Sequence, residues 1–345
     1  MKNQNYTVNI FRKLSLNSYL CRNPYYLNKM KRYLLLLFFS LALVYLKAQS
    51  SVDTLRLSDY LSKIEQNGQC IGSLAIMKDG KNIYARRLGK DLLRNKQEIE
   101  YPLYRVGSIT KMFTAVLIYQ EIEKGRLKLE DKLSDYFPEI PRAGDITIYQ
   151  LLEHTAGLGD YVMKNGTYSW MFSEVSNSDI MEEIIRQGIL YEPGTDFKYS
   201  NSGYYLLANI LRKIHKKAYF EILDEEIIRP LGLLVSASGI ISDSDEALPY
   251  EKNAAGEWVE VPDFYFLNVM GVGDILSSPE NINLFLHALF TGKLISKEHL
   301  QIMKPYGDDR HGRGMIIMNI NTMDIPGTLL EFIPLAYIMN RKIYQ

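Results

Sequence analysis

The stretch that decides the fold is residues 104–119, which read YRVGSITKMFTAVLIY. Ser108 and Lys111 lie where a loop enters residues 112–119, a segment that is apolar nearly all round. A helix that is hydrophobic on every face is a central, buried one, and Gly125 is placed to end it. Three positions apart at a helix start, Ser108 and Lys111 share one face about one turn apart. The segment therefore predicts both a central helix and a candidate reaction centre.

The Ser108–Lys111 pair suits acyl transfer. A serine hydroxyl is a poor nucleophile at neutral pH and needs a nearby base. The first turn of a helix presents free N–H groups and the positive end of the dipole, which favour a developing oxyanion. A lysine at that positive end, facing an apolar interior, is pushed toward its neutral form and can accept or relay the serine proton. The alternative is an N-capping serine with a surface lysine.

A second candidate group is Tyr199-Ser200-Asn201. The Tyr199 phenol can act as a general base if an adjacent ammonium lowers its pKa. Asn201 offers an amide that can orient a lysine or a substrate carbonyl. The alternative for Tyr199 is an aromatic turn residue without a chemical role.

The remaining pattern predicts an α/β (α+β) fold. Apolar runs on either side of Asp79-Gly80 indicate a hairpin, and Ser278-Pro279 is typical of a helix start. Strands near both ends of the chain, with helices between them, favour one antiparallel sheet closed by the N- and C-terminal segments and flanked by helices, with an inserted, mostly helical lobe. The expected helices are 53–66, 151–154, 204–214 and 282–290, and the expected late strands are 315–318 and 332–338.

Composition excludes several classes of protein. The chain has 345 residues, 47% of them hydrophobic, and its 40 Lys and Arg balance 40 Asp and Glu. Such a composition is globular rather than disordered or fibrous, and zero net charge argues against a nucleic-acid partner. The two cysteines and the histidines show no zinc-site spacing, so we expect no metal.

The beginning of the chain predicts export. Residues 30–50 read MKRYLLLLFFSLALVYLKAQS, with a positive start, an apolar run over 33–46 and small Ala48. This is the layout of a signal peptide cleaved after Ala48, with Met30 as the expected true start. We expect a leader over 1–48 and a domain over 52–345, with a sheet lobe at about 52–129 and 266–345 and a helical lobe at about 130–265. The expected location is periplasmic or secreted; a membrane anchor requires the leader to stay uncleaved.

Five segments together resemble the serine β-lactamase-related family, which includes class C β-lactamases, penicillin-binding DD-peptidases, D-aminopeptidases and esterases. They are residues 71–80, YRVGSITK at 104–111, ITIYQLLEHTAGL at 146–158, PGTDFKYSNSGY at 193–204, and 271–294. The resemblance covers roughly 55–327 and implies the β-lactamase/transpeptidase-like fold. It implies that Ser108 is the acylated nucleophile, Lys111 its partner, Tyr199 the general base or proton relay and Asn201 a substrate-orienting amide. We interpret His154 as structural, fixing a turn by hydrogen bonding.

The third motif of this family, Lys or His followed by Thr or Ser and then Gly, is altered here. Its best counterpart is Asn321-Thr322-Met323, with Thr322 as a substrate-binding candidate. Asn321 lacks the positive charge, and Met323 has a long side chain where Gly lets a substrate approach closely. His311-Gly312-Arg313-Gly314 resembles the turn that precedes this strand. A further strand and helix are expected after this point, so we also expect that the natural tail is altered or truncated.

Three readings of the function remain open. The first is an exported serine hydrolase that forms an acyl-enzyme on an amide or ester, with a β-lactam, a D-amino-acid (cell-wall) peptide or a small ester as substrate. This chemistry needs no metal or organic cofactor. The second is a degenerate penicillin-binding-like protein that keeps the fold but lacks a working third motif. A membrane-anchored interaction module is a third reading and requires residues 33–46 to remain in place.

Overall fold

The computed structural model describes residues 52–89, 102–237, 246–304 and 312–315. One compact unit of the chain ends at Lys63 and the second begins at Ile64. The division falls within helix α3 (Thr54–Gln66). This helix confirms the one predicted over 53–66. The predicted leader, the strand at 332–338 and the altered third motif lie outside the described residues.

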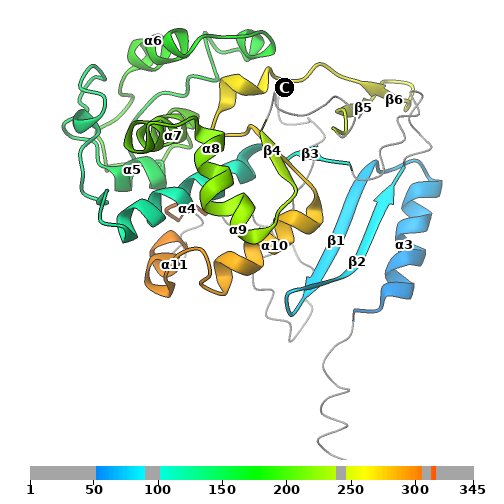
Figure 1. Cartoon of the computed structure of the whole chain (residues 1–345). Helices are drawn as coiled ribbons and strands as arrows, with labels where there is room; N and C mark the ends of the chain where they lie inside the picture. Colours follow the sequence, from blue (N-terminus) through cyan, green and yellow to red (C-terminus); the bar gives the residue numbers. More distant parts are fainter. Residues whose placement is uncertain (1–51, 90–101, 238–245, 305–311, 316–345) are drawn as a thin grey trace, which may run out of the picture. The chain divides into compact units, whose positions relative to one another are not determined.

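The predicted hairpin is present in the second unit. Strand β1 (Gly72–Lys78) pairs antiparallel with β2 (Lys81–Leu88), in a register that sets Gly72 opposite Leu88. Asp79 and Gly80 both have positive φ, as a tight turn between two strands requires. Helix α10 (Pro279–Phe290) packs against β1 (Figure 1).

The other described strands form two small antiparallel sheets. β3 (Tyr104–Arg105) and β4 (Val235–Ala237) flank β7 (Ile275–Ser277), and β5 (Tyr250–Lys252) pairs with β6 (Trp258–Glu260). Among its described residues, the segment 130–265 therefore contains the short strands β4, β5 and β6 besides its helices, and β4 pairs with β7. Helix α10 begins two residues after the end of β7, so this segment connects the β3–β7–β4 sheet directly to a helix.

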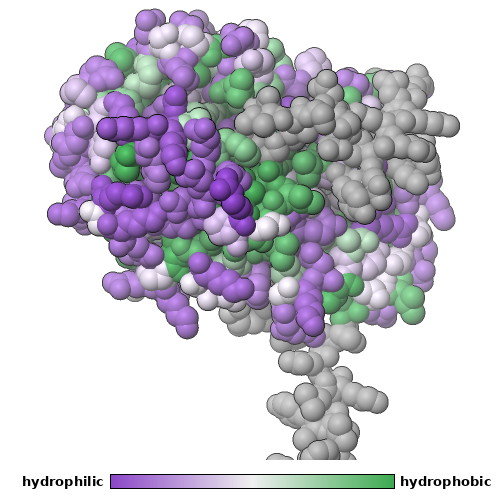
Figure 2. Space-filling model, viewed as in Figure 1, coloured by the Kyte–Doolittle hydropathy of each residue, from purple (hydrophilic) through white to green (hydrophobic). Residues whose placement is uncertain are grey.

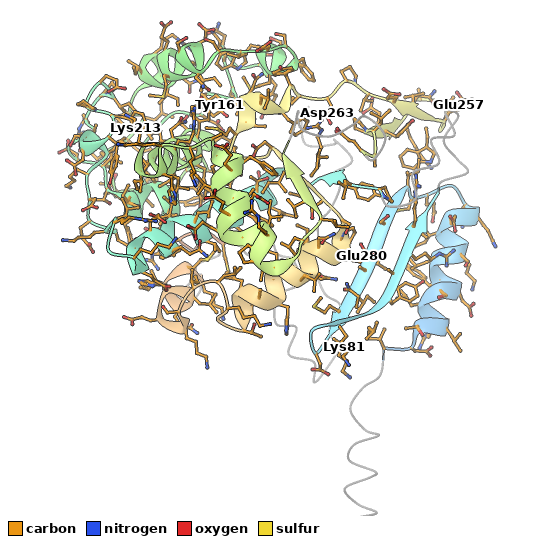
Figure 3. The ribbon with its side chains drawn as sticks, in the orientation of Figure 1. Lys81, Tyr161, Lys213, Glu257, Asp263 and Glu280 are labelled. Carbon is orange, nitrogen blue, oxygen red and sulfur yellow. The ribbon has the colours of Figure 1, made fainter. Side chains whose placement is uncertain are left out.

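The remaining helices surround one hydrophobic core (Figures 1 and 3). Tyr161, labelled in Figure 3, is fully buried there, and its hydroxyl donates to the carbonyl of Asn268 (2.7 Å). These helices are η3 (Leu133–Asp135), α5 (Ile148–Glu153), η4 (Ser169–Phe172), α6 (Asn177–Gln187), α7 (Asn201–His215), α8 (Tyr219–Leu223), the π-helical turn η5 (Asp224–Ile228), α9 (Arg229–Leu231), η6 (Phe266–Val269) and α11 (Lys297–Met303).

Helix α4 (Thr110–Glu123), entered through the 3₁₀ turn η2 (Gly107–Ile109), is the central helix that the sequence predicted. Its residues from Phe113 to Tyr119 are all buried, so it has no solvent-facing side over this length. It ends where predicted, with Gly125 at φ 70°. The Phe113 ring stacks on Phe285 of α10 with ring centroids 3.7 Å apart. The core thus fixes the start of α4 from several directions.

Two helix starts have side-chain caps, and the one at Ser278 was predicted. The Ser278 hydroxyl accepts from the Asn281 N–H (3.3 Å) at the start of α10, with Pro279 at its first position. Thr147 and Gln150 form a reciprocal capping box at the start of α5.

On the face shown in Figure 2, hydrophilic side chains cover most of the surface over α5, α6 and α7. Within the part of the chain that the structure describes, no helix has the length and apolar character to cross a bilayer.

Replacing Phe113 by Ala should lower the free energy of unfolding by about 3–5 kcal/mol, because a fully buried, stacked ring is lost. Urea denaturation of the full chain measures this loss. Leu190→Ala is the matched control, since Leu190 is 51% exposed and its truncation should change stability by less than about 0.5 kcal/mol. A loss below about 1 kcal/mol for Phe113→Ala would contradict the central position of α4.

Candidate active site

The structure brings three of the predicted residues to one point. The Lys111 ammonium nitrogen Nζ lies 3.1 Å from Ser108 Oγ, and the Tyr199 hydroxyl donates to the same Oγ at 2.7 Å. Ser108 is in the turn that starts α4, whereas Tyr199 precedes α7, some 91 positions later in the chain. Ser108 is exposed, so a molecule arriving from solvent can reach the oxygen on which the other two converge.

The backbone at Ser108 is shaped by its neighbours. Gly107 has φ 54°, a conformation that favours glycine, and it turns the chain from β3 into the helix start. Just before it, the Val106 N–H donates to the Ile275 carbonyl of β7 (3.0 Å). The Thr110 hydroxyl accepts from the Ile275 N–H (3.3 Å). The turn that carries Ser108 is therefore held on both sides by β7.

Lys111 is buried, with only 4% of its surface exposed. Besides Ser108, its Nζ donates to the backbone carbonyl of Val272 (3.0 Å). Burial lowers the pKa of Lys111 to about 7, although the nearby negative charge of Asp160 acts to raise it. The lowered pKa agrees with the sequence-based expectation for a lysine at this position. The alternative of a surface lysine is wrong.

Tyr199 differs from expectation in its ionisation. Burial raises the pKa of its phenol, and the hydrogen bond to Ser108 offsets this only in part. A role as general base requires a neighbouring ammonium to lower this pKa. Lys111 does lie near the Tyr199 ring, with its Nζ 4.9 Å from the ring centroid, yet burial and the charge of Asp160 both raise the phenol pKa. The phenol is therefore a hydrogen-bond donor at neutral pH rather than a ready-made tyrosinate base.

Asn201, the first residue of α7, bonds to Asp160. Its side-chain amide donates to Asp160 Oδ2 (2.9 Å), and the Val162 N–H donates to Asp160 Oδ1 (3.2 Å). Among the described residues, Lys111 donates to Ser108 and Val272 and not to Asn201. Asn201 therefore acts on the lysine only indirectly, through the carboxylate that it holds. Thr322, the other predicted substrate-binding residue, lies outside the described residues.

Asp160 is a residue of this site that the sequence analysis missed. Burial raises the pKa of its carboxyl, while the Val162 N–H, Lys111 and Asn201 each act to lower it. It is the charged group whose field counteracts the desolvation of Lys111. The sequence did hold a signal for this residue: Asp160 is an acidic residue only two positions after Leu158, the last residue of the family segment 146–158. The Val272 carbonyl had no such signal, since a backbone acceptor leaves no mark in the side-chain pattern.

His154 positions the loop that carries Tyr199. It ends α5 in the left-handed conformation (φ 63°), and its Nδ1 accepts from the Ser200 N–H (3.2 Å). Its carbonyl accepts from the Lys198 N–H (3.1 Å), and its ring stacks on that of Tyr199 with centroids 4.5 Å apart. The acceptor role of Nδ1 places the proton of the neutral ring on Nε2. These contacts fit the interpretation of His154 as a residue that fixes a turn.

Comparison with known proteins agrees with this arrangement. The family model described as “Beta-lactamase” matches residues 59–314 of the chain. The chain belongs to the beta-lactamase family. This confirms the serine β-lactamase-related family suggested by the five sequence segments.

Two curated relatives of this beta-lactamase family chain are penicillin-binding proteins of Bacillus subtilis (strain 168). The chain is 28% identical over 285 residues to the putative penicillin-binding protein PbpX, covering 79% of this chain and 68% of the relative. It is 29% identical over 248 residues to penicillin-binding protein 4*, covering 66% of this chain and 53% of the relative. The chain thus spans about two thirds and about half of the lengths of these relatives.

Solved structures share the fold of this beta-lactamase family chain. D-amino acid amidase from Ochrobactrum anthropi SV3, complexed with D-phenylalanine, matches with a TM-score of 0.66 and 23% identity, over 77% of this chain and 82% of that one. The penicillin-binding protein from Bacillus halodurans matches with a TM-score of 0.63 and 23% identity, over 74% and 81%. The mixed helix and strand fold is therefore that of β-lactamases and penicillin-binding proteins, as predicted.

Replacing His154 by Ala should destabilise the protein by about 1–3 kcal/mol, because the Ser200 N–H loses its acceptor and alanine disfavours a left-handed backbone. Asn is the matched substitution, since it tolerates this conformation and keeps an acceptor. His154→Asn should lose less than half as much in the same urea denaturation series. Equal stability of His154→Ala and wild type would refute the assigned role.

Proposed function

We propose that the chain is a serine hydrolase that forms an acyl-enzyme on an amide or ester. The observation that carries the proposal is the convergence of Lys111 Nζ and the Tyr199 hydroxyl on Ser108 Oγ, at 3.1 and 2.7 Å. A nucleophile within hydrogen-bond reach of a base is the arrangement that activates a hydroxyl. The family supports the same reaction class.

Lys111 is the proposed base for the attack. With a pKa of about 7, a large part of the lysine is a neutral amine at neutral pH. One amine N–H then donates to the Val272 carbonyl, which turns the nitrogen lone pair toward Ser108 Oγ. As Oγ forms its bond to the substrate carbonyl carbon, its proton passes to Nζ, and the carbonyl π electrons move to the oxygen.

The helix start and Tyr199 serve the later steps of the proposal. The Ser108 N–H stands at the first turn of η2 and α4, where the dipole and free N–H groups stabilise the oxyanion of the tetrahedral intermediate. The Tyr199 hydroxyl, which is hydrogen-bonded to Ser108 Oγ, donates its proton to the leaving nitrogen or oxygen. Protonated Lys111 then returns a proton to Tyr199. Water then attacks the acyl-enzyme by the reverse path and releases Ser108.

The relatives support a proposal for the substrate class. Two are named penicillin-binding proteins, and a structural neighbour is a D-amino acid amidase. We propose an amide next to a D-amino acid, as in a cell-wall peptide or its β-lactam mimic, with small esters as the simpler alternative. Export through a leader cleaved after Ala48 belongs to the proposal, since a cell-wall peptide lies outside the cytoplasm.

A fluorescent penicillin or a fluorophosphonate probe should label the wild-type chain covalently and should not label Ser108→Ala. The serine oxygen is the only atom of the proposed centre that forms the covalent bond. In-gel fluorescence and the intact mass of the adduct measure the result. Equal labelling of both proteins would refute the nucleophile, and no labelling or turnover of the wild type would favour the degenerate protein suggested by Asn321-Thr322-Met323.

The acylation rate of wild type should rise between pH 6 and 8, since Lys111 must lose its proton to act as the base and has a pKa of about 7. Below pH 6 the rate should fall about tenfold per pH unit. Lys111→Arg should react about 10²- to 10⁴-fold more slowly and without this rise, because a guanidinium stays protonated. Stopped-flow acylation by a chromogenic ester measures both profiles.

Asp274→Asn is the control for this pH profile. Burial also raises the pKa of Asp274 to about 7, so its titration falls in the same pH range. Its carboxylate accepts from the Gly271 N–H (2.9 Å) and makes no hydrogen bond to Ser108 or Lys111. The variant should keep the rise between pH 6 and 8; loss of the rise in Asp274→Asn would assign the profile to Asp274 instead.

A further inference from the structure

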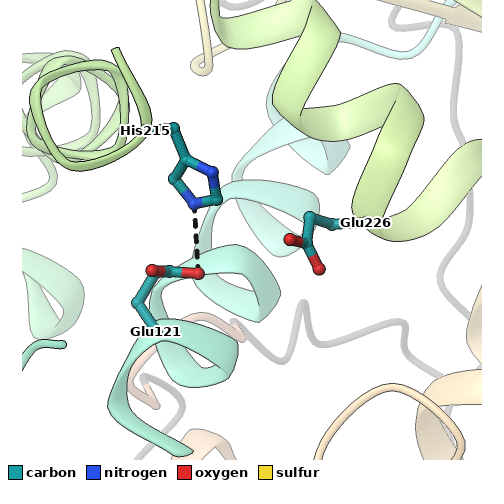
Figure 4. Close-up of side chains that lie close together, drawn as sticks. All are labelled: Glu121, His215 and Glu226. Atoms are coloured by element: carbon teal, nitrogen blue, oxygen red, sulfur yellow. Dashed lines mark ion pairs between the residues drawn. The ribbon is translucent and has the colours of Figure 1, made fainter. Parts of the chain in front are cut away.

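A second polar cluster lies at the opposite end of the two helices that carry the candidate active site. It consists of Glu121 near the end of α4, His215 at the end of α7, and Glu226 in the π-helical turn η5 (Figure 4). One carboxylate oxygen from each glutamate and one imidazole nitrogen all lie within 4.8 Å of one another. Figure 4 shows the three side chains pointing toward a common space.

The cluster is partly buried, with the Glu226 side chain 27% exposed, and the imidazole nitrogen Nε2 of His215 lacks a well-formed hydrogen bond. The Glu121 side chain is 1% exposed and that of His215 is 10% exposed. His215 Nε2 lies 3.1 Å from Glu121 Oε1 but makes no hydrogen bond of acceptable geometry with any described residue. Two ligands bound to one zinc ion at about 2.0–2.2 Å stand roughly 3–3.5 Å from each other. The pair therefore has the spacing of two ligands that face a third atom.

Two cations already neutralise the carboxylates. Arg126 donates to both oxygens of Glu121, at 2.6 and 2.8 Å. The Lys124 ammonium lies 2.7 Å from Glu226 Oε2 and 3.3 Å from Glu121 Oε1, so it bridges the two acidic groups. The Lys124 side chain is 36% exposed and ends at the surface, from which it can swing into water. The folded structure thus places a positive charge, that of the Lys124 ammonium, between Glu121 and Glu226. Because this side chain reaches the surface, another cation can take its place.

We propose that Glu121, His215 and Glu226 form a binding site for a divalent transition-metal ion of the Zn²⁺ class, which displaces the Lys124 ammonium. Two carboxylates and one imidazole are a donor set that suits zinc, with water at the fourth position. Arg126 remains paired with both oxygens of Glu121 and orients that carboxylate, as outer partners of metal ligands do.

The location gives the ion a structural role. α4 and α7 pack against each other, and both run from the candidate active site to this cluster. Lys111 and Glu121 lie on the same helix, about 15 Å apart at 1.5 Å per residue. An ion bound here does not reach Ser108. It joins the far ends of the two helices whose first turns carry Lys111 and Asn201, and so holds the starts of these helices in place relative to each other.

Titration of the metal-free full chain with ZnCl₂, followed by calorimetry and thermal unfolding, tests the proposal. We expect one ion per chain and a rise in melting temperature with Zn²⁺ concentration, since binding to the folded state stabilises it. Co²⁺ should bind at the same site and show visible absorption bands of a nitrogen- and oxygen-ligated ion. Metal binding does not depend on hydrolase activity, so this test stands apart from the labelling of Ser108.

Variants on either side of the cluster give opposite expectations. His215→Gln and Glu226→Gln should weaken Zn²⁺ binding at least about tenfold, whereas Lys124→Met should strengthen it, because the competing ammonium is gone. Glu225→Gln is the matched control: Glu225 lies in the same π-helical turn but pairs with Lys217 (2.6 Å), so its loss should leave affinity unchanged. Absence of Zn²⁺ binding in both wild type and Lys124→Met, or equal binding by wild type and His215→Gln, would overturn the proposal.

Discussion

The burial of one amine, that of Lys111, is the constraint on which the rest of the site depends. A lysine that is 4% exposed must either pair its charge or give up its proton. Here the amine donates to one backbone carbonyl and one hydroxyl, and Asp160 supplies a partly compensating field. Neither partner fully replaces water, so the pKa falls to about 7. The same desolvation that costs stability leaves the protein with an amine that is partly neutral near pH 7.

The fold supplies this burial by closing α4 on every side. α7 and α10 pack around the helix, and the segment between Gly271 and Ser277 delivers both the Val272 carbonyl and strand β7. Buried hydrogen bonds continue one helical turn after Lys111. The Thr114 hydroxyl is hydrogen-bonded to the Tyr219 hydroxyl and donates to the Gly271 carbonyl, both at 2.6 Å. Because α4 and α7 begin at the site and end near Glu121 and His215, polar groups fix both ends of the same pair of helices.

Local patterns made much of this predictable. The all-apolar segment after Lys111 could only be a central helix, the Asp79-Gly80 turn fixed the hairpin, and Ser278 and Pro279 marked the start of α10. The convergence of Ser108 and Lys111 followed from helical spacing alone. That of Tyr199 required the family resemblance, since no local rule brings together residues 91 positions apart. The catalytic roles and the leader remain predictions.

What the sequence did not reveal depended on long-range packing. Asp160 matters because α7 begins beside it, and the Val272 carbonyl is a backbone group. The condition set for Tyr199 as a base, a lowered pKa, is not met, because burial raises the pKa of its phenol. Glu121, His215 and Glu226 come from three separate elements, so no local motif indicates that these side chains lie close together. Short strands such as β4 were missed because three residues carry too little alternation to be recognised.

The most direct test of the central claim is the ionisation of Lys111 itself. Protein labelled with ¹³C at the lysine Cε carbons gives one NMR signal for each lysine, and Lys111→Met identifies the signal of this residue. We expect this signal to titrate with a midpoint of about pH 7 in the free protein. A midpoint near the ordinary lysine value of 10.5 would mean that the amine is a permanent cation, and it would contradict the proposed attack by Ser108.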